Sequence, residues 1–371
     1  MREYLLVLLV ATAATYLFAA VCRQLALRWN AVAKVRARDV HTSPKPYFGG
    51  LAMFGGLVVC LILAVNMPFL SRSATVGHDA LVVLLASGLI CAVGLVDDVV
   101  ELSPVVKFGG QVLAAGAAVL GGVRIYWIPL PNVVLALDDA SSILITVIFI
   151  AVCANAVNFV DGLDGLAAGL VAVGAGAFFA YSYVLAYEQD LARATTASLL
   201  TVATLGICLG FLGHNFQPAH MFMGDAGSML LGFLMAMSAI SFTGQVDPSA
   251  LSRDHDDVLP ALLPVLLPFA TMALPLSDLV LAWIRRTARG QHPFKADKHH
   301  LHHRLVARGH SQRGVVFIMC SWGAVIAGGL VCTVLLNHPA TWWAIGVFLV
   351  LLVLVTVMPI GRRRSKAAKH G

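Results

Sequence analysis

Charged residues are scarce in this chain, and long apolar runs stand in their place. Lys, Arg, Asp and Glu make up 12% of its 371 residues and hydrophobic residues 59%, whereas a soluble protein carries about 25% charged residues. Paired cysteines of the CxxC type are absent too. The seven cysteines lie in or beside apolar runs, which excludes a disulfide framework and a cysteine metal cluster. The composition indicates an integral membrane protein rather than a large soluble enzyme.

The apolar residues fall into blocks near the ~20 residues that a helix needs to cross the hydrocarbon layer. Because lipid offers the backbone no hydrogen-bond partner, we expect an all-α polytopic membrane protein of about eleven transmembrane helices. The first block is too long for a signal peptide and no small-x-small cleavage site follows it, so we interpret it as a retained helix. The blocks are residues 4–27, 47–66, 80–96, 108–123, 141–158, 163–186, 197–213, 228–243, 258–284, 314–336 and 341–360.

The distribution of basic residues predicts the orientation. If the N-terminus lies outside, 20 of the 25 Lys and Arg residues fall on the inward side. Positive residues favour the cytoplasmic side, so we predict an inner-membrane protein with an outside N-terminus and a cytoplasmic C-terminus. This topology also explains the net charge of +6, and no nucleic-acid partner is expected.

The unusual polar residues gather on the inward side. We treat residues 1–371 as one membrane domain with inward loops near 28–46, 97–107, 155–165, 214–228 and 285–313. Because these loops share one membrane face, we expect their polar clusters to form one site. The clusters are Asp97-Asp98-x-x-Glu101, Asn155-x-x-Asn158-x-x-Asp161-Gly162-Leu163-Asp164-Gly165, His214-Asn215 with Phe222-Met223-Gly224-Asp225, and Lys298-His299-His300-Leu301-His302-His303-Arg304.

The first two clusters differ in how strongly they indicate function. Two adjacent carboxylates at an apolar helix end, Asp97 and Asp98, favour a cation nearby, although a solvated helix end carries such residues too. In the second cluster, Asn155 and Asn158 are spaced to share one helical face. Their cost of insertion at a membrane boundary favours a functional role over a plain turn.

The last two clusters each allow two interpretations. Asp225 directly precedes an apolar block, so it is either a helix N-cap or a ligand of Mg²⁺, which prefers one or two carboxylates plus substrate phosphates. The segment from His299 to Arg304 has no cysteine nearby, which disfavours structural zinc. It is either a cationic lid over phosphates or simply a basic inward loop.

Taken in this order, the clusters resemble those of the polyprenyl-phosphate N-acetylhexosamine-1-phosphate transferases, the MraY/WecA superfamily. Arg38-x-x-His41 followed by Pro46-x-x-Gly49-Gly50 is similar to the first cytoplasmic loop of that family, and the resemblance runs from about Arg38 to Leu305. The run His300-Leu301-His302-His303-Arg304 resembles the branch that transfers N-acetylglucosamine-1-phosphate.

The resemblance implies an enzyme that transfers N-acetylglucosamine-1-phosphate from UDP-N-acetylglucosamine to a polyprenyl phosphate, either undecaprenyl or decaprenyl. The products are polyprenyl-diphospho-N-acetylglucosamine and UMP, and the reaction is the first membrane step of a cell-envelope glycan. It implies Mg²⁺ as cofactor, with Mn²⁺ as a substitute, and membrane lipid and a second copy in a homodimer as further partners. One diphosphate bond replaces another, so the catalyst mainly positions and neutralises phosphates.

The resemblance also implies residue roles. Asp97 or Asp98 would orient the attacking lipid phosphate, and perform or assist its deprotonation. Asp225 and Asn158 would hold the metal ion, and Lys107 and His41 are weaker candidates for contact with the lipid phosphate. The nucleotide-binding candidates are Asn155, Asp161, Gly162, Leu163, Asp164, Asn215 and Phe222. The candidates for the diphosphate and sugar are His300, His302, His303 and Arg304. Direct attack is favoured over a covalent enzyme intermediate, because positioning and a metal ion suffice.

Other functions stay open at this point. The same reaction with another UDP-N-acetylhexosamine or with UDP-N-acetylmuramoyl-pentapeptide is the nearest alternative. An ion or metal transporter is the alternative from a different class, but its ionisable residues would lie near mid-helix and often in inverted repeats. Here the acidic residues gather at helix ends, with Asp278 the exception, and the two halves of the chain show no repeat. A membrane scaffold gives no reason for four polar clusters on one side.

Overall fold

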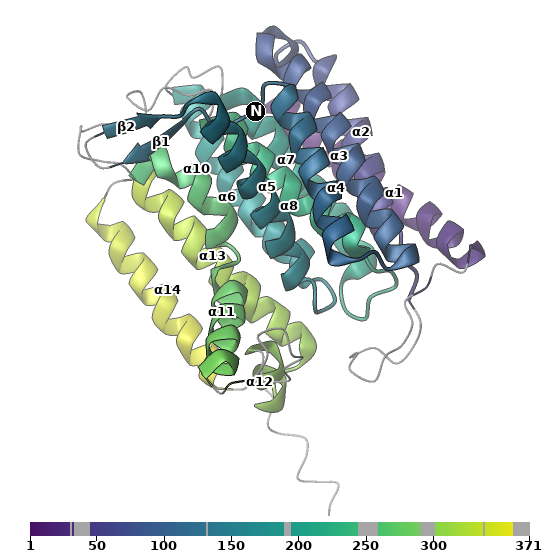
Figure 1. The fold of residues 1–371 in the computed structure, drawn as a ribbon. Coiled ribbons are helices and arrows are strands. Elements are labelled where there is room, and N and C mark those ends of the chain that lie inside the picture. Colours follow the sequence, from purple (N-terminus) through teal and green to yellow (C-terminus); the bar gives the residue numbers. More distant parts are fainter. Residues whose placement is uncertain are drawn as a thin grey trace, which may run out of the picture.

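The structure is a computed structural model that describes residues 1–29, 32, 45–130, 133–188, 194–243, 259–288, 290, 301–336 and 338–358. In these residues the chain is a bundle of long helices with one short hairpin (Figure 1). The helices are α1 (Arg2–Arg28), α2 (Gly49–Val65), η1 (Leu70–Arg72), α3 (Ala74–Val100), α4 (Pro104–Leu120), α5 (Asp139–Val160), α6 (Leu166–Glu188), α7 (Ala194–Asn215), α8 (Gly224–Thr243), α10 (Leu259–Ala270), α11 (Ala273–Ala288), α12 (Leu301–Ala307), α13 (Gln312–Leu336) and α14 (Pro339–Val357).

Eight of the described helices are long and apolar enough to cross a membrane: α1, α3, α5, α6, α7, α8, α13 and α14. Two shorter apolar helices, α2 and α4, lie between them in the chain. This confirms a mainly helical, multi-pass membrane protein, and in the described residues each apolar block predicted from the sequence lies mostly in helix. The total of eleven crossings and the outside N-terminus stay predictions.

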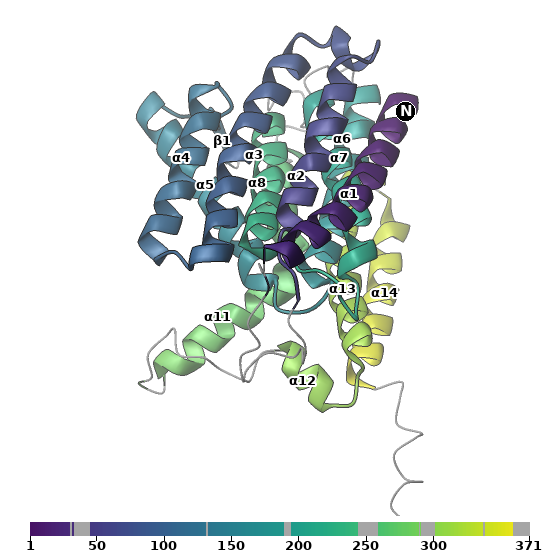
Figure 2. The same cartoon turned by 90° about the vertical axis from the view of Figure 1, so that its right-hand side faces the viewer.

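The ninth apolar block, residues 258–284, forms two helices instead of one. Helix α10 ends at Ala270, a turn follows at Thr271 and Met272, and α11 starts at Ala273. Pro275 lies in the first turn of α11, where proline is tolerated because the backbone N–H groups there need no partner within the helix. Helices α11 and α12 both lie beyond one end of the bundle (Figure 2).

The fold agrees with the predicted all-α class, and one short hairpin adds to it. Between α4 and α5 the chain forms an antiparallel hairpin of β1 (Trp127–Leu130) and β2 (Val133–Ala136). Trp127 pairs with Ala136 and Leu130 with Val133. Pro129 is tolerated because a two-stranded sheet consists of edges only. The hairpin lies at the end of the bundle opposite to α12 (Figure 1).

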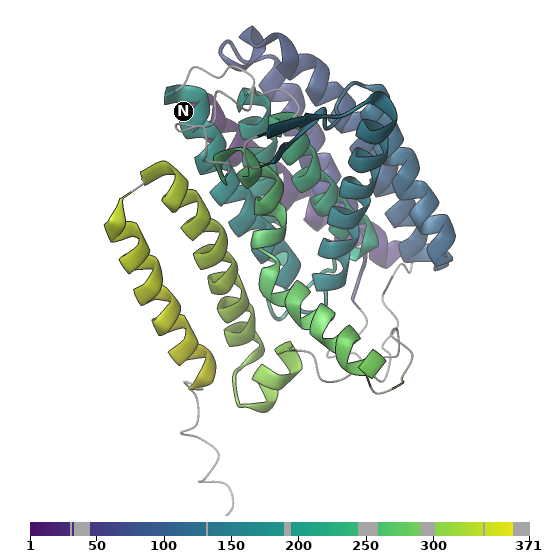
Figure 3. The same cartoon turned by 60° about the vertical axis from the view of Figure 1, so that its left-hand side comes forward.

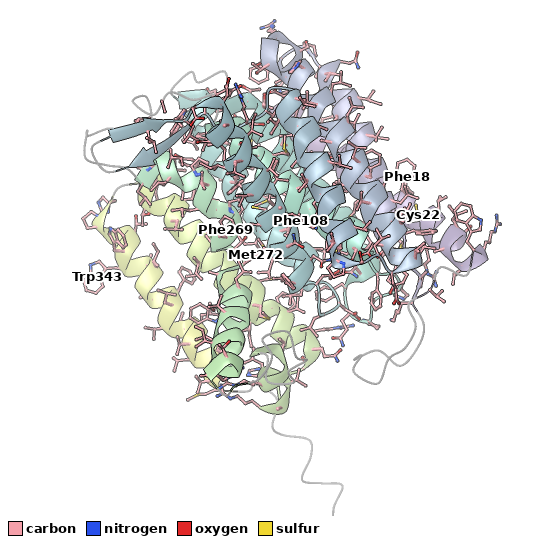
Figure 4. All side chains as sticks on the ribbon, in the orientation of Figure 1. Phe18, Cys22, Phe108, Phe269, Met272 and Trp343 are labelled. Carbon is pink, nitrogen blue, oxygen red and sulfur yellow. The ribbon has the colours of Figure 1, made fainter. Side chains whose placement is uncertain are left out.

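Helix α8 is the centre of the bundle and α14 its periphery. Every residue from Ala226 to Thr243 is buried, as expected for a helix that is apolar on all sides and surrounded by others. Helix α14 lies outside α13 (Figure 3), and its Trp343 is 79% exposed and projects away from the bundle (Figure 4). The core helix α8 therefore brings its N-terminus among several neighbours, whereas α14 suits contact with lipid.

The two ends of the bundle carry different elements, and we call them the hairpin end and the site end. The hairpin end carries the hairpin and the N-terminus, where the Glu3 carboxylate accepts hydrogen bonds from the backbone N–H groups of Phe69 and Leu70 at 2.8 and 2.9 Å. The site end is the opposite one, where α3 and α5 finish, α4 and α8 begin, and α11 and α12 lie (Figures 1 and 2). Helices that alternate in direction place the described parts of the predicted inward clusters at this single end.

Candidate functional site

Four helices deliver one charged or amide side chain each to a common point at the site end. Lys107, in the first turn of α4, lies 3.0 Å from the Asp97 carboxylate of α3 and also makes a short ion pair with the Asp225 carboxylate of α8. The amide of Asn158, from α5, donates to Asp225 Oδ1 at 2.8 Å. Residues up to 128 positions apart in the chain thus form one cluster, which we call the carboxylate cluster: Asp97, Lys107, Asn158 and Asp225.

Asp98 has a different task from its neighbour Asp97. Its two carboxylate oxygens accept hydrogen bonds from the backbone N–H groups of Asp225 at 2.7 Å and Ala226 at 3.3 Å. Asp98 therefore caps the N-terminus of α8 from another helix, satisfying donors that have no partner within α8. Of the two interpretations of Asp225, the N-cap role goes to Asp98, and the Asp225 side chain faces Lys107 and Asn158 instead.

Small residues permit this close contact between α3 and the start of α8. Gly224 has a φ of +68°, and a Cβ atom there would lie 2.2 Å from the Asp98 carboxylate. A Cβ atom on Gly94, one turn before Asp98 in α3, would lie 2.4 Å from the Cα atom of Ala226. At Gly94 the α8 backbone leaves no room for a side chain, and at Gly224 the Asp98 carboxylate fills that space while the positive φ favours glycine.

Two predicted nucleotide-binding residues join the loop after α5 to the loop after α7. The buried Asn215 side chain accepts from the Gly165 N–H at 2.9 Å and donates to the Met221 carbonyl at 2.9 Å. The Asp164 carboxylate accepts from the Ala219 N–H at 3.0 Å. The structure therefore brings these two sequence clusters together as predicted, and it uses polar atoms of both residues to hold the loops in contact.

The other predicted nucleotide residues occupy different surroundings. Leu163 is buried in the core, so its side chain supports the loop from below. Gly162 is exposed with open space where a Cβ atom would point. The backbone of Phe222 bonds to the start of α2, donating to the Pro46 carbonyl at 3.0 Å and accepting from Gly49 at 3.1 Å. Gly162 is thus the member of this group with free space around it.

Asp161 follows the last residue of α5 and lies outside the spanning segments. Burial, together with the negative charges of Asp225 and Asp164, raises the pKa of Asp161 to about 7. A carboxylate in such surroundings favours a proton or a cation. Five carboxyl groups thus lie at the site end: Asp97, Asp98, Asp161, Asp164 and Asp225.

Asn155, predicted to contact the nucleotide, lies one helical turn below Asn158, toward the interior of the bundle. Its amide is engaged with the buried Gln111 of α4 and with the Ala151 carbonyl of its own helix. Sequence reasoning missed Gln111, although an amide one turn after Lys107 in an apolar helix was an available signal. It also missed Ser228, whose hydroxyl accepts from Asn158 at 2.8 Å. The sequence made Lys107 a weaker candidate for contact with the lipid phosphate, whereas in the structure it contacts both carboxylates of the cluster.

The last predicted cluster is only partly described. His41 and His300 lie outside the described residues. His302 and His303 lie in α12, of which the structure describes the backbone here, and Arg304 in the same helix is exposed. Helix α12 is anchored by the buried Leu305 and lies at the site end (Figure 2). The α12 backbone is therefore on the correct side for the predicted role, and the contacts of its histidines stay a prediction.

The donor set of the cluster suits a hard divalent cation better than zinc. Within the described residues, no group of three or more His, Cys, Asp or Glu side chains is arranged to hold a metal ion. The carboxylates of Asp97 and Asp225 already share one cation, the ammonium of Lys107. Two carboxylates and an amide leave most coordination positions to substrate phosphates and water, as Mg²⁺ prefers.

The comparisons with known proteins agree with this geometry. Residues 80–243, which contain all four members of the carboxylate cluster, match the model of glycosyl transferase family 4. The whole chain is 40% identical to the decaprenyl-phosphate N-acetylglucosaminephosphotransferase of Mycolicibacterium smegmatis, covering 92% of that protein. The chain belongs to glycosyl transferase family 4. The predicted resemblance to the polyprenyl-phosphate transferases is thereby confirmed.

Two further relatives of this family 4 member show the spread of the similarity. Mycobacterium tuberculosis has a protein of the same name that is 41% identical over 98% of this chain and 90% of its own length. The undecaprenyl-phosphate alpha-N-acetylglucosaminyl 1-phosphate transferase of Yersinia pestis is 28% identical over 91% of this chain and 86% of its own length. The family 4 chain therefore shares nearly its full length with transferases named for two different polyprenyl phosphates.

Proposed function

We propose that this protein transfers N-acetylglucosamine-1-phosphate from UDP-N-acetylglucosamine to a polyprenyl phosphate and releases UMP. The observation that carries the proposal is the carboxylate cluster: helices distant in sequence place two carboxylates, an ammonium and an amide at one point of the site end. The names of the relatives supply the substrates, since those proteins are named for N-acetylglucosamine phosphate transfer to decaprenyl or undecaprenyl phosphate.

The depth of the cluster fits two substrates of opposite solubility. The lipid phosphate lies at the headgroup plane and its prenyl chain in the hydrocarbon, whereas the sugar nucleotide comes from water. The cluster lies at the ends of membrane helices, where both can arrive. From the positive-inside distribution we propose that the site end faces the cytoplasm of a bacterial inner membrane.

We propose Mg²⁺, with Mn²⁺ as a substitute, held by Asp225 and Asn158 with Asp97 within reach. Asp97 and Asp225 already share a cation, and the side-chain amide of Asn158 supplies an oxygen once its orientation is reversed. When bound, the ion would neutralise charge on the diphosphate and on the leaving UMP.

In the proposed reaction, an oxygen of the lipid phosphate attacks the sugar-bearing phosphorus of UDP-N-acetylglucosamine. The bond from that phosphorus to the UMP oxygen breaks, and UMP leaves with the electron pair. Asp97 would orient the attacking phosphate, and Lys107 would neutralise it. Asp98 would act through the backbone, by fixing the first turn of α8 and with it Asp225. Such positioning of reactants can supply much of the rate enhancement.

The remaining residues would hold the sugar nucleotide. We propose that the uridine lies along the joined loops after α5 and α7, near the exposed Gly162, with Phe222 offering a ring for stacking. Asp161, Asp164 and Asn215 would keep these loops in place. Arg304 and the histidines His300, His302 and His303 would contact the diphosphate and the sugar from above.

Labelled substrate tests the proposal directly. Purified protein in detergent is incubated with UDP-[¹⁴C]N-acetylglucosamine, Mg²⁺ and decaprenyl or undecaprenyl phosphate. We expect labelled lipid and an equal amount of UMP, with neither product when the lipid phosphate is left out. UDP-N-acetylmuramoyl-pentapeptide and other UDP-N-acetylhexosamines run in parallel define the sugar. No labelled lipid from any donor would overturn the proposal, and a transporter would give that result.

A further inference from the structure

A second polar layer lies one helical turn below the carboxylate cluster. It consists of Gln111 on α4, Asn155 on α5 and Met229 on α8. Gln111 follows Lys107 by four residues, Met229 follows Asp225 by four, and Asn155 precedes Asn158 by three. Residues at these spacings lie on the same face of a helix. The deeper layer therefore repeats the cluster above it, on three of the same four helices.

The geometry of this layer is a reciprocal amide pair. The Asn155 amide nitrogen donates to Gln111 Oε1 at 2.6 Å and to the Ala151 carbonyl at 2.8 Å. The Gln111 amide nitrogen is 3.4 Å from Asn155 Oδ1 and donates to the Met229 sulfur at 3.1 Å. All four amide hydrogens thus have an acceptor. The Ala151 carbonyl fixes the orientation of the pair, because a rotated Asn155 would face it with an oxygen.

Burial of two amides carries a desolvation cost that apolar side chains at this depth of the bundle would not carry. Gln111 is 1% exposed, and a buried amide is tolerated only when its hydrogen bonds are made at specific distances. An apolar contact lets helices slide, whereas a reciprocal amide pair is satisfied at one register. The layer therefore specifies how far α4 and α5 extend toward the site end relative to one another.

We infer that Gln111 is a positioning residue that sets the register of Lys107 against Asn158 and Asp225. This inference rests on the proposed function. Gln111 does not reach the substrates: its partners are Asn155 and Met229. It fixes α4 to α5 and α8 one turn below the reacting groups, so that the ammonium of Lys107 meets the Asp225 carboxylate to which Asn158 donates.

The test shortens, lengthens and then swaps the amide pair. Gln111→Asn and Asn155→Gln each keep an amide but break the match in length. We expect either variant to lower kcat by about 10- to 100-fold, because small displacements of reacting groups have effects of this size. The KM for UDP-N-acetylglucosamine should change less than about twofold, because the proposed contacts of this substrate lie on the loops after α5 and α7. The double variant Gln111→Asn/Asn155→Gln should recover most of the lost kcat.

A matched control separates positioning from mere stability. Thr201→Val removes a buried hydroxyl that bonds to its own helix in α7, away from the site end, and should leave kcat unchanged. Melting temperatures in detergent are measured for all variants, and kcat is expressed per folded protein from size-exclusion chromatography. A purely structural pair would lower the melting temperature with unchanged kcat, which overturns the inference.

Two other results overturn the inference as well. These are wild-type kcat in both single variants, and a swap that is no better than the weaker single variant. Failure of the proposed function is distinct from these, because the unaltered protein would then produce no labelled lipid at all. A single variant that does not fold leaves the other single variant and the swap to decide.

Discussion

At the scale of the residue, the adjacent acids Asp97 and Asp98 perform different tasks because they face different partners. The sequence predicts that the pair is important, but it does not divide the roles. The division arises when the first turn of α8 packs against Asp98, which leaves Asp97 facing Lys107. Which carboxylate meets a segment more than 120 residues later is a property of the folded bundle, and local sequence carries no record of it.

The carboxylates that face Lys107 should be needed for turnover. We expect Asp225→Asn and Asp97→Asn to lower kcat by roughly 100-fold or more, as losses of groups that stabilise or position reacting phosphates do. Both variants should insert and elute as folded protein. Asp139→Asn is the control, since this exposed acid pairs with Arg124 at the hairpin end. Near-normal kcat in the Asp225 variant contradicts its proposed role at the metal ion.

The raised pKa of Asp161 predicts a dependence of stability on pH. Its pKa is about 7 in the folded protein, against about 4 in an unfolded chain, so the folded state holds a proton more tightly. This contribution to stability is complete below pH ~4 and is lost as the pH rises through about 7. The melting temperature in detergent without added metal should therefore fall between pH 5 and pH 8, and less so in Asp161→Asn. Equal slopes in both proteins contradict the assignment.

At the scale of the element, the N-terminus of α8 depends on contacts from α2 and α3 as much as on its own sequence. The Asp98 carboxylate caps it, and Gly50 of α2 bonds to the Met223 carbonyl just before it, at 2.9 Å. The motif Met223-Gly224-Asp225 was recognisable in the sequence. The reason for its glycine is visible only in the structure, where the Asp98 carboxylate fills the space of a side chain.

Gly224→Ala should damage the site without touching any charged residue. The positive φ would cost about 1–2 kcal/mol, and the new methyl group would displace the Asp98 carboxylate from the start of α8. We expect a lower melting temperature and a fall in kcat of roughly tenfold or more. Gly116→Ala in α4 is the matched control, because open space surrounds its Cβ position and alanine favours helix. A Gly224 variant as active as this control contradicts the capping arrangement.

The elements that the sequence did not predict have local physical reasons. The hairpin from Trp127 to Ala136 reads as an apolar outward loop, and strands of four residues carry too little periodicity to be distinguished. The break before α11 was signalled by Pro275, but a proline inside an apolar block is also compatible with a kinked, continuous helix. Long apolar helices, by contrast, were predictable because the membrane imposes their length.

At the scale of the whole molecule, sequence reasoning succeeded where one constraint acts on many residues. The membrane imposes helix lengths, and alternation of helices then sends the clusters at Asp97, Asn158 and Asp225 to one end. The pairing within that end was not predictable, because it depends on how far each helix extends. Gln111 illustrates this limit: its partners Asn155 and Met229 lie on helices 44 and 118 residues away.

The orientation of the protein in the membrane can be tested by labelling single cysteines at the two ends of the bundle. With the N-terminus outside, the hairpin end faces the periplasm and the site end the cytoplasm. Of the seven cysteines Cys332 alone is exposed, so the variant Cys332→Ser has no exposed native cysteine that would react with the label. Leu135 in the hairpin is 47% exposed. In the Cys332→Ser protein, Leu135→Cys should therefore react with a membrane-impermeant maleimide once the outer membrane is permeabilised. Gly162→Cys, on the exposed loop after α5, should react only after the inner membrane is permeabilised. Labelling of Gly162→Cys in sealed spheroplasts would place the carboxylate cluster on the side where no sugar nucleotide is made, and the proposed reaction would lose its soluble substrate.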